Sequence, residues 1–233
     1  MNTEAFNSKQ FLQEWVDERR SIYDKAVITC DGNIAFNPME PGSFNPRWHP
    51  ELGGGPSVFY QMLMDYKNEI PDLCDVNYFV ETGTFSGITA MAYAEAIDHV
   101  HTAEIRPWDE YKAIKDKHDN ITFWGGDSVA FLKKLLPTIP DERCIFLLDA
   151  HDGVSHVPIV EELECIRDLS NVNNHIIIID DCTDCGQGNF PDWGEIERNL
   201  RIINSDYKVK RWEHDARNFR QPTIAYPGPW SQI

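Results

Sequence analysis

The segment Tyr78–Ala90, YFVETGTFSGITA, decides the fold of this chain. It opens with an apolar, strand-like run that ends at Glu81, and Gly83 and Gly87 follow before a series of small helix-forming residues. A strand, a glycine-containing turn and a helix in this order are typical of proteins that bind a nucleotide at the turn. The residue types in this turn then indicate which nucleotide the turn could bind.

From Asp75 onward the chain alternates short apolar runs with amphipathic stretches, which predicts strands and helices in turn. The predicted strands are 76–80, 99–105, 121–124, 144–148 and the run HIIIIDD at 175–181, with a closing antiparallel pair at 207–212 and 222–226. The predicted helices are 86–97, 107–118, 128–136, 159–169 and 193–204. Short strands that are apolar throughout indicate a mostly parallel sheet covered on both faces, hence a doubly wound α/β fold with an antiparallel C-terminal strand.

The first part of the chain has a different character. Residues 5–25 and 57–69 show helical spacing, whereas 32–56 contain several prolines and a triple glycine and predict a long surface loop or lid. We therefore expect two regions, an extension of helix and Pro/Gly-rich lid at 1–72 and an α/β domain at 73–233.

Composition narrows the function classes. The net charge of −17 argues against a general electrostatic attraction to nucleic acid or to an anionic membrane. No apolar run approaches the ~20 residues that span a bilayer. The six cysteines are scattered along the chain, which in a protein of 233 residues indicates reduced thiols and a cytoplasmic location.

Acidic residues stand at or just beyond the end of every predicted parallel strand. They are Glu81, Glu104, Asp127, Asp149 and the pair Asp180–Asp181. Acids also cap helices and turns, so each one alone has a structural explanation. Because ligands of such sheets bind beyond the carboxyl ends of the strands, the whole set at one edge indicates a binding site.

Two phosphate-binding patterns fail at the turn. A dinucleotide fingerprint requires glycine where Phe85 and Ile88 stand, and a P-loop requires lysine after its second glycine, where Ile88 follows Gly87. A nucleoside without phosphates suits the acidic edge better. Glu104 lies 21 residues after Gly83, near the spacing at which an acid accepts the ribose hydroxyls, and Asp127 could accept from an adenine amine. A sulfonium tolerates acidic surroundings, so these features describe S-adenosylmethionine.

The segments FVETGTFSG, HTAEI, WGGDSVAFL, FLLDAH, VPIVEELECI and HIIIIDD together resemble the class I S-adenosylmethionine-dependent methyltransferases, over residues 75 to about 226. Asp149 with Asp180–Asp181 is similar to the metal-dependent sugar O-methyltransferases, such as the macrocin O-methyltransferase family. That resemblance implies a Rossmann-like methyltransferase sheet and three aspartates that hold Mg²⁺ or Mn²⁺, which also binds the hydroxyls of the acceptor. Where that family often has Asp-Gly-Asp, this chain has Asp149-Ala150-His151-Asp152.

The predicted site follows from the turn and from the resemblance. The cofactor-binding residues are Glu81, Thr82, Gly83, Thr84, Ser86, Gly87, Glu104, Asp127, Ser128 and Asp149; the metal ligands are Asp149, Asp180 and Asp181. Carboxylate oxygens suit Mg²⁺ better than zinc. His151 has a suitable reference pKa, ~6.5, for the general base, and Asp152 is its rival. A role of Asp180–Asp181 in capping the loop stays open.

Two further motifs have uses that the sequence leaves open. Cys182 and Cys185 have the C-x-x-C spacing of a zinc site, but no second pair lies nearby, which favours two free thiols. Trp48 and His49 either face a sugar or anchor the lid. The function predicted is S-adenosylmethionine-dependent, metal-dependent O-methylation of a hydroxylated small molecule, a sugar or glycoconjugate. A non-catalytic nucleotide-binding module and a metal-independent methyltransferase remain alternative functions. The sequence leaves open whether the protein forms a homo-oligomer.

Overall fold

The computed structural model describes residues 26–28, 34–36, 76–84, 87–94, 97–106, 118–151, 156–211 and 222–227. Its strands are β1 (Ala26–Ile28), β2 (Ile34–Phe36), β3 (Tyr78–Thr82), β4 (His99–Glu104), β5 (Ile121–Gly125), β6 (Cys144–Leu148), β7 (Ile176–Ile179), β8 (Tyr207–Arg211) and β9 (Thr223–Pro227). Its helices are α3 (Ile88–Ala94), α5 (Ser128–Leu135), α6 (Ile159–Leu169) and α7 (Trp193–Ile203), with the short 3₁₀ turns η3 (Leu136–Thr138) and η4 (Cys182–Asp184).

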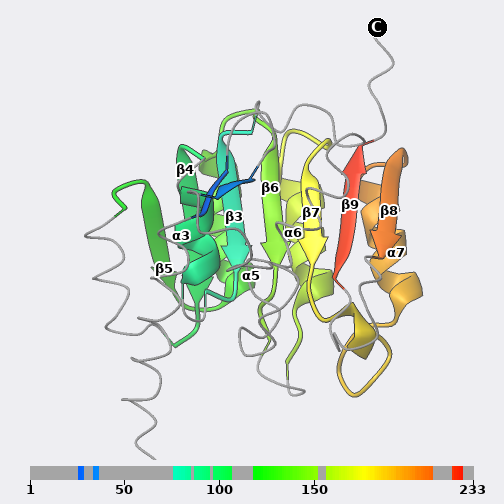
Figure 1. The fold of residues 1–233 in the computed structure, drawn as a ribbon. Coiled ribbons are helices and arrows are strands. Elements are labelled where there is room, and N and C mark those ends of the chain that lie inside the picture. The colour runs from blue at the N-terminus through cyan, green and yellow to red at the C-terminus, as the bar shows by residue number, and fades with distance from the viewer. Residues whose placement is uncertain are drawn as a thin grey trace, which may run out of the picture.

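Seven strands form one sheet in the order β5-β4-β3-β6-β7-β9-β8 (Figure 1). The strands β3 to β7 pair in parallel, and β9 is antiparallel to both of its neighbours, β7 and β8. The predicted doubly wound, mostly parallel sheet with an antiparallel C-terminal strand is therefore confirmed. The sequence indicates strands that are apolar throughout and covered on both faces. The structure agrees with this at β6 and β7, which are buried at every position.

Helices cover both faces of this sheet. The helices α5, α6 and α7 pack on one face, and α3 lies on the other (Figure 1). On the α3 face, the ring of Tyr93 stacks on that of Phe79 from β3, with 3.8 Å between the centroids. On the opposite face, Leu132, Leu163 and Leu200 of the three helices are each fully buried. This two-sided burial explains why the parallel strands lack polar alternation.

Several predicted bounds differ from the observed ones. The strand predicted at 76–80 lies at Tyr78–Thr82, because Glu81 and Thr82 continue it as buried polar residues. The helix predicted at 86–97 is observed over Ile88–Ala94, and Leu136 begins a 3₁₀ turn where an α-helix was expected to end. The predictions for 144–148 and 159–169 match β6 and α6.

The prediction of an uninterrupted loop over 32–56 is wrong at its start, since Ile34–Phe36 pairs with Ala26–Ile28 as an antiparallel hairpin. β-branched Val27, Ile28 and Ile34 favour the extended backbone of such a hairpin. The predicted helices 5–25 and 57–69, residues 107–117 of a further helix, and Trp48 and His49 lie outside the described residues. The boundary between 1–72 and 73–233 stays a prediction. In the described ranges, every helix is too short or too polar to cross a membrane.

Candidate active site

The strand order reverses between β3 and β6, which are neighbours in the sheet. From β3 the chain proceeds outward through β4 and β5, and then it crosses to β6 and proceeds outward to β7 (Figure 1). The loops that follow β3 and β6 therefore leave the sheet in opposite directions. In open α/β sheets this is the point at which ligands bind. The predicted site residues that the structure describes lie at or just beyond the carboxyl ends of these parallel strands.

Gly83 brings the two diverging loops into direct contact. The amide of Asp149 donates to the Thr82 carbonyl oxygen at 3.1 Å, and a Cβ added to Gly83 would lie 2.2 Å from the Asp149 carbonyl oxygen. Gly83 also has φ +84°, which side-chain-bearing residues rarely adopt. The missing side chain of Gly83 thus leaves room for the backbone of Asp149.

Beneath this turn lies a buried chain of polar side chains. Thr102 Oγ1 donates to Glu81 Oε2 at 2.5 Å, and the Thr84 and Thr102 hydroxyls are 2.6 Å apart. Glu81 is 2% exposed, and burial raises the pKa of its carboxyl group to about 8. A carboxyl group that is protonated near neutral pH can bridge β3 to β4 without a buried charge. The predicted cofactor residue Glu81 thus supports the turn from inside.

The other predicted cofactor residues lie further along the same edge. Glu104 is half-buried, its carboxylate accepts from the Arg106 amide at 3.1 Å, and its carbonyl accepts from the Gly126 amide. Asp127 is exposed and caps α5, since its side chain accepts from the Ala130 amide at 2.8 Å. Helix capping is thus a demonstrated role of Asp127. Of the remaining predicted residues, Thr82, Thr84, Gly87 and Ser128 are buried, and Ser86 lies outside the described residues.

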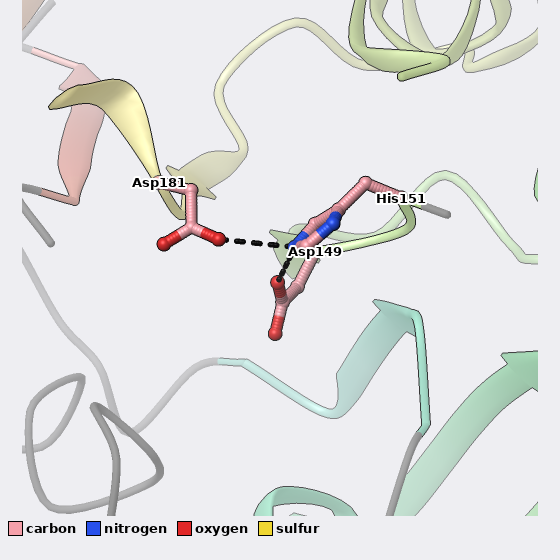
Figure 2. Close-up of side chains that lie close together, drawn as sticks. All are labelled: Asp149, His151 and Asp181. Carbon is pink, nitrogen blue, oxygen red and sulfur yellow. Dashed lines mark ion pairs between the residues drawn. The ribbon is translucent and has the colours of Figure 1, made fainter. Parts of the chain in front are cut away.

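Three predicted residues converge beyond β6 and β7. Asp149, His151 and Asp181 each offer one ligand atom, and these atoms lie within 4.8 Å of one another. His151 Nε2 is 3.0 Å from Asp181 Oδ2 and 3.7 Å from Asp149 Oδ1 (Figure 2). Figure 2 shows both carboxylates directed toward the one imidazole ring. We call these three residues the DHD cluster. Asp181 is almost buried, whereas Asp149 and His151 are each about a quarter exposed at their side chains.

The backbone of Asp181 is held in an unusual conformation. Its φ of 53° is the only positive value among the described residues other than glycine. A left-handed conformation costs an L-residue ~1 to 2 kcal/mol, and aspartate and asparagine tolerate it better than most. Strain of this kind gathers at functional positions. The carboxylate of this residue lies 3.0 Å from His151 Nε2.

The structure separates the remaining candidates from the cluster. Asp180 is 3% exposed, its amide donates to the Leu148 carbonyl at 3.1 Å, and its carboxylate is not one of the three groups that converge. Asp152 lies outside the described residues. The donor set is therefore two carboxylates and one imidazole, in place of the three carboxylates that the sequence suggested.

This donor set fits a divalent metal ion. Carboxylate oxygens suit Mg²⁺ and Mn²⁺, whereas an imidazole nitrogen suits the transition metals. Mn²⁺ accepts both kinds of ligand, so we expect this set to prefer Mn²⁺ over Mg²⁺. Without a metal, the same geometry is that of an imidazole held by a carboxylate, as in a general base with its orienting acid.

Sequence reasoning missed one buried acid beside the site, Glu162 on α6. Its side chain is 0% exposed and lies beside the Ser128 and Thr82 side chains. Neither of its oxygens makes a hydrogen bond of regular geometry within the described residues. Burial raises the pKa of this carboxyl group to about 8. The sequence does carry a signal for the burial of Glu162, because helical spacing places it on the same face as the apolar Ile159 and Ile166.

The raised pKa of Glu162 has a consequence for stability. Between pH ~4.5, where the carboxyl titrates in the unfolded chain, and pH ~8, the folded state holds a proton that the unfolded state loses. The free energy of unfolding is therefore expected to fall as pH rises through this window, by up to ~1.4 kcal/mol per pH unit for this group. Urea unfolding of wild type and Glu162→Gln at pH 5.5, 6.5 and 7.5 measures the change, and the variant should show the shallower decline.

The matched control is Glu164→Gln, which removes an exposed acid of the same helix two residues away. It should leave the pH dependence of wild type intact. An equal decline in wild type and Glu162→Gln would show that Glu162 is ionised in the folded protein at neutral pH.

Comparisons with solved structures give likenesses at low sequence identity. The sequence matches no family model and no curated protein. A SAM-dependent methyltransferase from Archaeoglobus fulgidus has 13% identity over 74% of this chain and 94% of its own, with a TM-score of 0.48. A candidate methyltransferase of Escherichia coli has 12% identity, 83% and 90% coverage and a TM-score of 0.48. A candidate O-methyltransferase from Nostoc punctiforme has 13% identity, 76% and 57% coverage and the same TM-score. Likeness at this level carries no conclusion about the activity of this chain.

Proposed function

We propose that this protein is an S-adenosylmethionine-dependent O-methyltransferase that requires a divalent metal and acts on a hydroxyl of a sugar or glycoconjugate. The observation that carries the proposal is the double role of Asp149. Its backbone packs against the glycine turn at Gly83, and its carboxylate belongs to the DHD cluster. A nucleotide at the turn and an acceptor at the cluster would therefore lie side by side, as transfer between them requires.

The cofactor side of the proposal is supported by charge. Glu104 ends β4, and Asp127 caps the helix that follows β5, so two carboxylates lie at this edge of the sheet. Repulsion by these carboxylates disfavours nucleotide phosphates, whereas the ribose hydroxyls and the adenine amine are donors that carboxylates accept. A positively charged sulfonium completes a ligand that this edge would favour.

The acceptor side is supported by the donor set of the DHD cluster. Asp149, His151 and Asp181 would hold the metal, which lowers the pKa of a coordinated hydroxyl and so makes an alcohol a better nucleophile. Adjacent hydroxyls of a sugar can coordinate together, which suits a site with few protein ligands. The protein's own contribution is to place the acceptor oxygen in line with the methyl group.

One observation favours a second function, a metal-independent methyltransferase. The 3.0 Å contact between His151 Nε2 and Asp181 Oδ2 is of hydrogen-bond length, and a carboxylate that orients an imidazole can assist it as a general base. The two functions share the cofactor and differ in the metal. Turnover that persists in EDTA would decide for the second.

Cofactor binding is tested most directly at Glu104. Wild type is expected to bind S-adenosylmethionine or its demethylated product in calorimetry, and Glu104→Ala is expected to bind ~10- to 150-fold more weakly. This range corresponds to the ~1.5 to 3 kcal/mol of a hydrogen bond to a charged group. The exposed acid Glu164 supplies the control, since Glu164→Ala should bind as wild type does.

The outcomes separate the alternatives. Equal affinity in Glu104→Ala would remove this residue from the site. Tight binding of NAD would overturn the cofactor assignment. Binding of the cofactor without methyl transfer to any hydroxylated acceptor, with or without Mn²⁺, would instead support a non-catalytic nucleotide-binding module.

A further inference from the structure

The two cysteines that follow the DHD cluster lie on one short turn. Cys182 begins η4 and Cys185 follows its last residue. A 3₁₀ turn has three residues per turn, so residues at i and i+3 are eclipsed. With a rise of ~2.0 Å per residue, their Cα atoms lie ~6 Å apart, inside the ~4.4 to 6.8 Å range of disulfide-bonded cysteines.

The side chains of Cys182 and Cys185 differ in their surroundings. Both cysteines are free thiols, and the Cys182 thiol donates to the Ile179 carbonyl oxygen at 3.5 Å. The two thiols are close enough for each to shift the pKa of the other, upward for Cys182 and downward for Cys185. No group of metal-binding residues within the described part of the chain includes either thiol, which supports two free thiols over a zinc site. The pair is asymmetric, because Cys182 is 1% exposed whereas Cys185 is half-buried.

A cation sits beside this pair. Arg211 donates from Nη2 to the Cys182 carbonyl oxygen at 2.9 Å, and its guanidinium lies over the Trp193 ring at 4.7 Å from the centroid. The Cys182 thiol and the Arg211 charge lower the pKa of Cys185 to about 7. The accessible sulfur therefore carries a substantial thiolate fraction near neutral pH. For Cys144 and Cys165, which are buried in β6 and α6, burial is the largest effect and raises the pKa of each.

We propose that Cys182 and Cys185 form a redox-active dithiol, which a small-molecule disulfide such as oxidised glutathione converts reversibly into an intramolecular disulfide. The Cys185 thiolate attacks one sulfur of the small disulfide, whose S–S bond breaks and releases one thiolate. The Cys182 thiol then loses its proton to solvent and attacks the Cys185 sulfur, which releases the second thiolate. Two electrons pass from the cysteine pair to the small disulfide, which leaves as two thiols.

The bond would alter the neighbouring cluster. Asp181 precedes Cys182 directly, and its carbonyl accepts from the Asp184 amide at 2.9 Å, so it belongs to the turn that the disulfide closes. A change in this turn changes the direction of the Asp181 carboxylate toward His151. We expect oxidation to weaken Mn²⁺ binding by the DHD cluster by about tenfold, the lower end of the effect of disturbed ligand support. This consequence, unlike the dithiol itself, rests on the proposed function.

The test exposes the full chain to glutathione buffers of graded composition, traps the thiols by alkylation and maps the peptides by mass spectrometry. Wild type is expected to lose two hydrogens through a Cys182–Cys185 bond that dithiothreitol reverses. Cys182→Ser, which lacks the second thiol, is expected to retain one glutathione at Cys185. Cys185→Ser is expected to stay reduced at Cys182. Cys165→Ser should behave as wild type, and Cys182→Ala replaces Cys182→Ser if that variant fails to fold.

Four outcomes bear on the proposal. A Cys182–Cys185 bond in wild type and an adduct confined to Cys185 in Cys182→Ser support it. A wild-type pair that stays reduced in oxidised glutathione, or an adduct that forms at Cys182 in Cys185→Ser, overturns it. Mn²⁺ binding to both forms is measured by calorimetry. Absence of binding to the reduced form would count against the proposed function and leave the dithiol in place.

Discussion

Replacing Asp181 by asparagine is expected to abolish methyl transfer while leaving cofactor binding intact. The carboxylate of Asp181 lies 3.0 Å from His151 Nε2 and is one of the three groups able to hold the metal. Asparagine tolerates the left-handed backbone of this position, so the substitution removes charge without adding strain. Loss of the metal's contribution, several kcal/mol of transition-state stabilisation, corresponds to a decrease of ~10³-fold or more in turnover.

The measurement is turnover with added Mn²⁺, with Mg²⁺ and with EDTA, alongside calorimetry of cofactor binding. EDTA should reproduce the effect of Asp181→Asn in wild type, and Mn²⁺ should restore activity more fully than Mg²⁺. Asp184→Asn is the matched control, because Asp184 lies in the same turn outside the DHD cluster. Full wild-type turnover in EDTA would reject the metal and favour the His151–Asp181 pair as the catalytic unit.

His151→Ala is expected to shift the metal requirement. With Nε2 facing both carboxylates, His151 is placed as the third ligand, and its loss should raise the Mn²⁺ concentration for half-maximal activity by ~10- to 100-fold or more. Turnover at low Mn²⁺ should be almost absent and should recover in part when Mn²⁺ is raised. An activity titration with Mn²⁺ measures both quantities.

His156→Ala is the control, since His156 is exposed and is not part of the cluster. A different result for His151→Ala would support the role of general base, which the sequence suggested for His151. If turnover falls ~10² to 10⁴-fold at every Mn²⁺ concentration, with metal affinity unchanged, His151 is the general base. The two roles thus differ in whether added metal compensates for the missing imidazole.

The sheet could be predicted because the residues of each strand alone indicate a buried parallel strand. Cys144–Leu148 and Ile176–Ile179 are apolar throughout, which is characteristic of parallel strands buried on both faces. The end of β3 was less predictable, because Glu81 reads as the polar residue that ends a strand. Its burial depends on a raised pKa and on the hydrogen bond from Thr102, a partner 21 residues away in the sequence.

For the site, the sequence placed Asp149 and Asp181 at the ends of adjacent strands but could not show the direction of their side chains. That direction depends on the left-handed backbone of Asp181 and on the path of the loop through His151, and neither has a local sequence signal. Asp180 and Asp181 are equivalent in sequence, yet only Asp181 joins the cluster. Adjacency along the chain could not distinguish them.

The place of β9 between β7 and β8 has a consequence for the synthesis of the protein. The chain makes β8 before β9, yet β8 reaches the sheet only through β9. β9 begins 44 residues after β7 ends, so at ~5 to 20 residues per second a ribosome needs ~2 to 9 s to supply it. During that interval the four isoleucines of β7 present an unpaired edge, a ready template for pairing with another nascent chain. We expect a chaperone that shields exposed strands to be of most use to this protein in those few seconds.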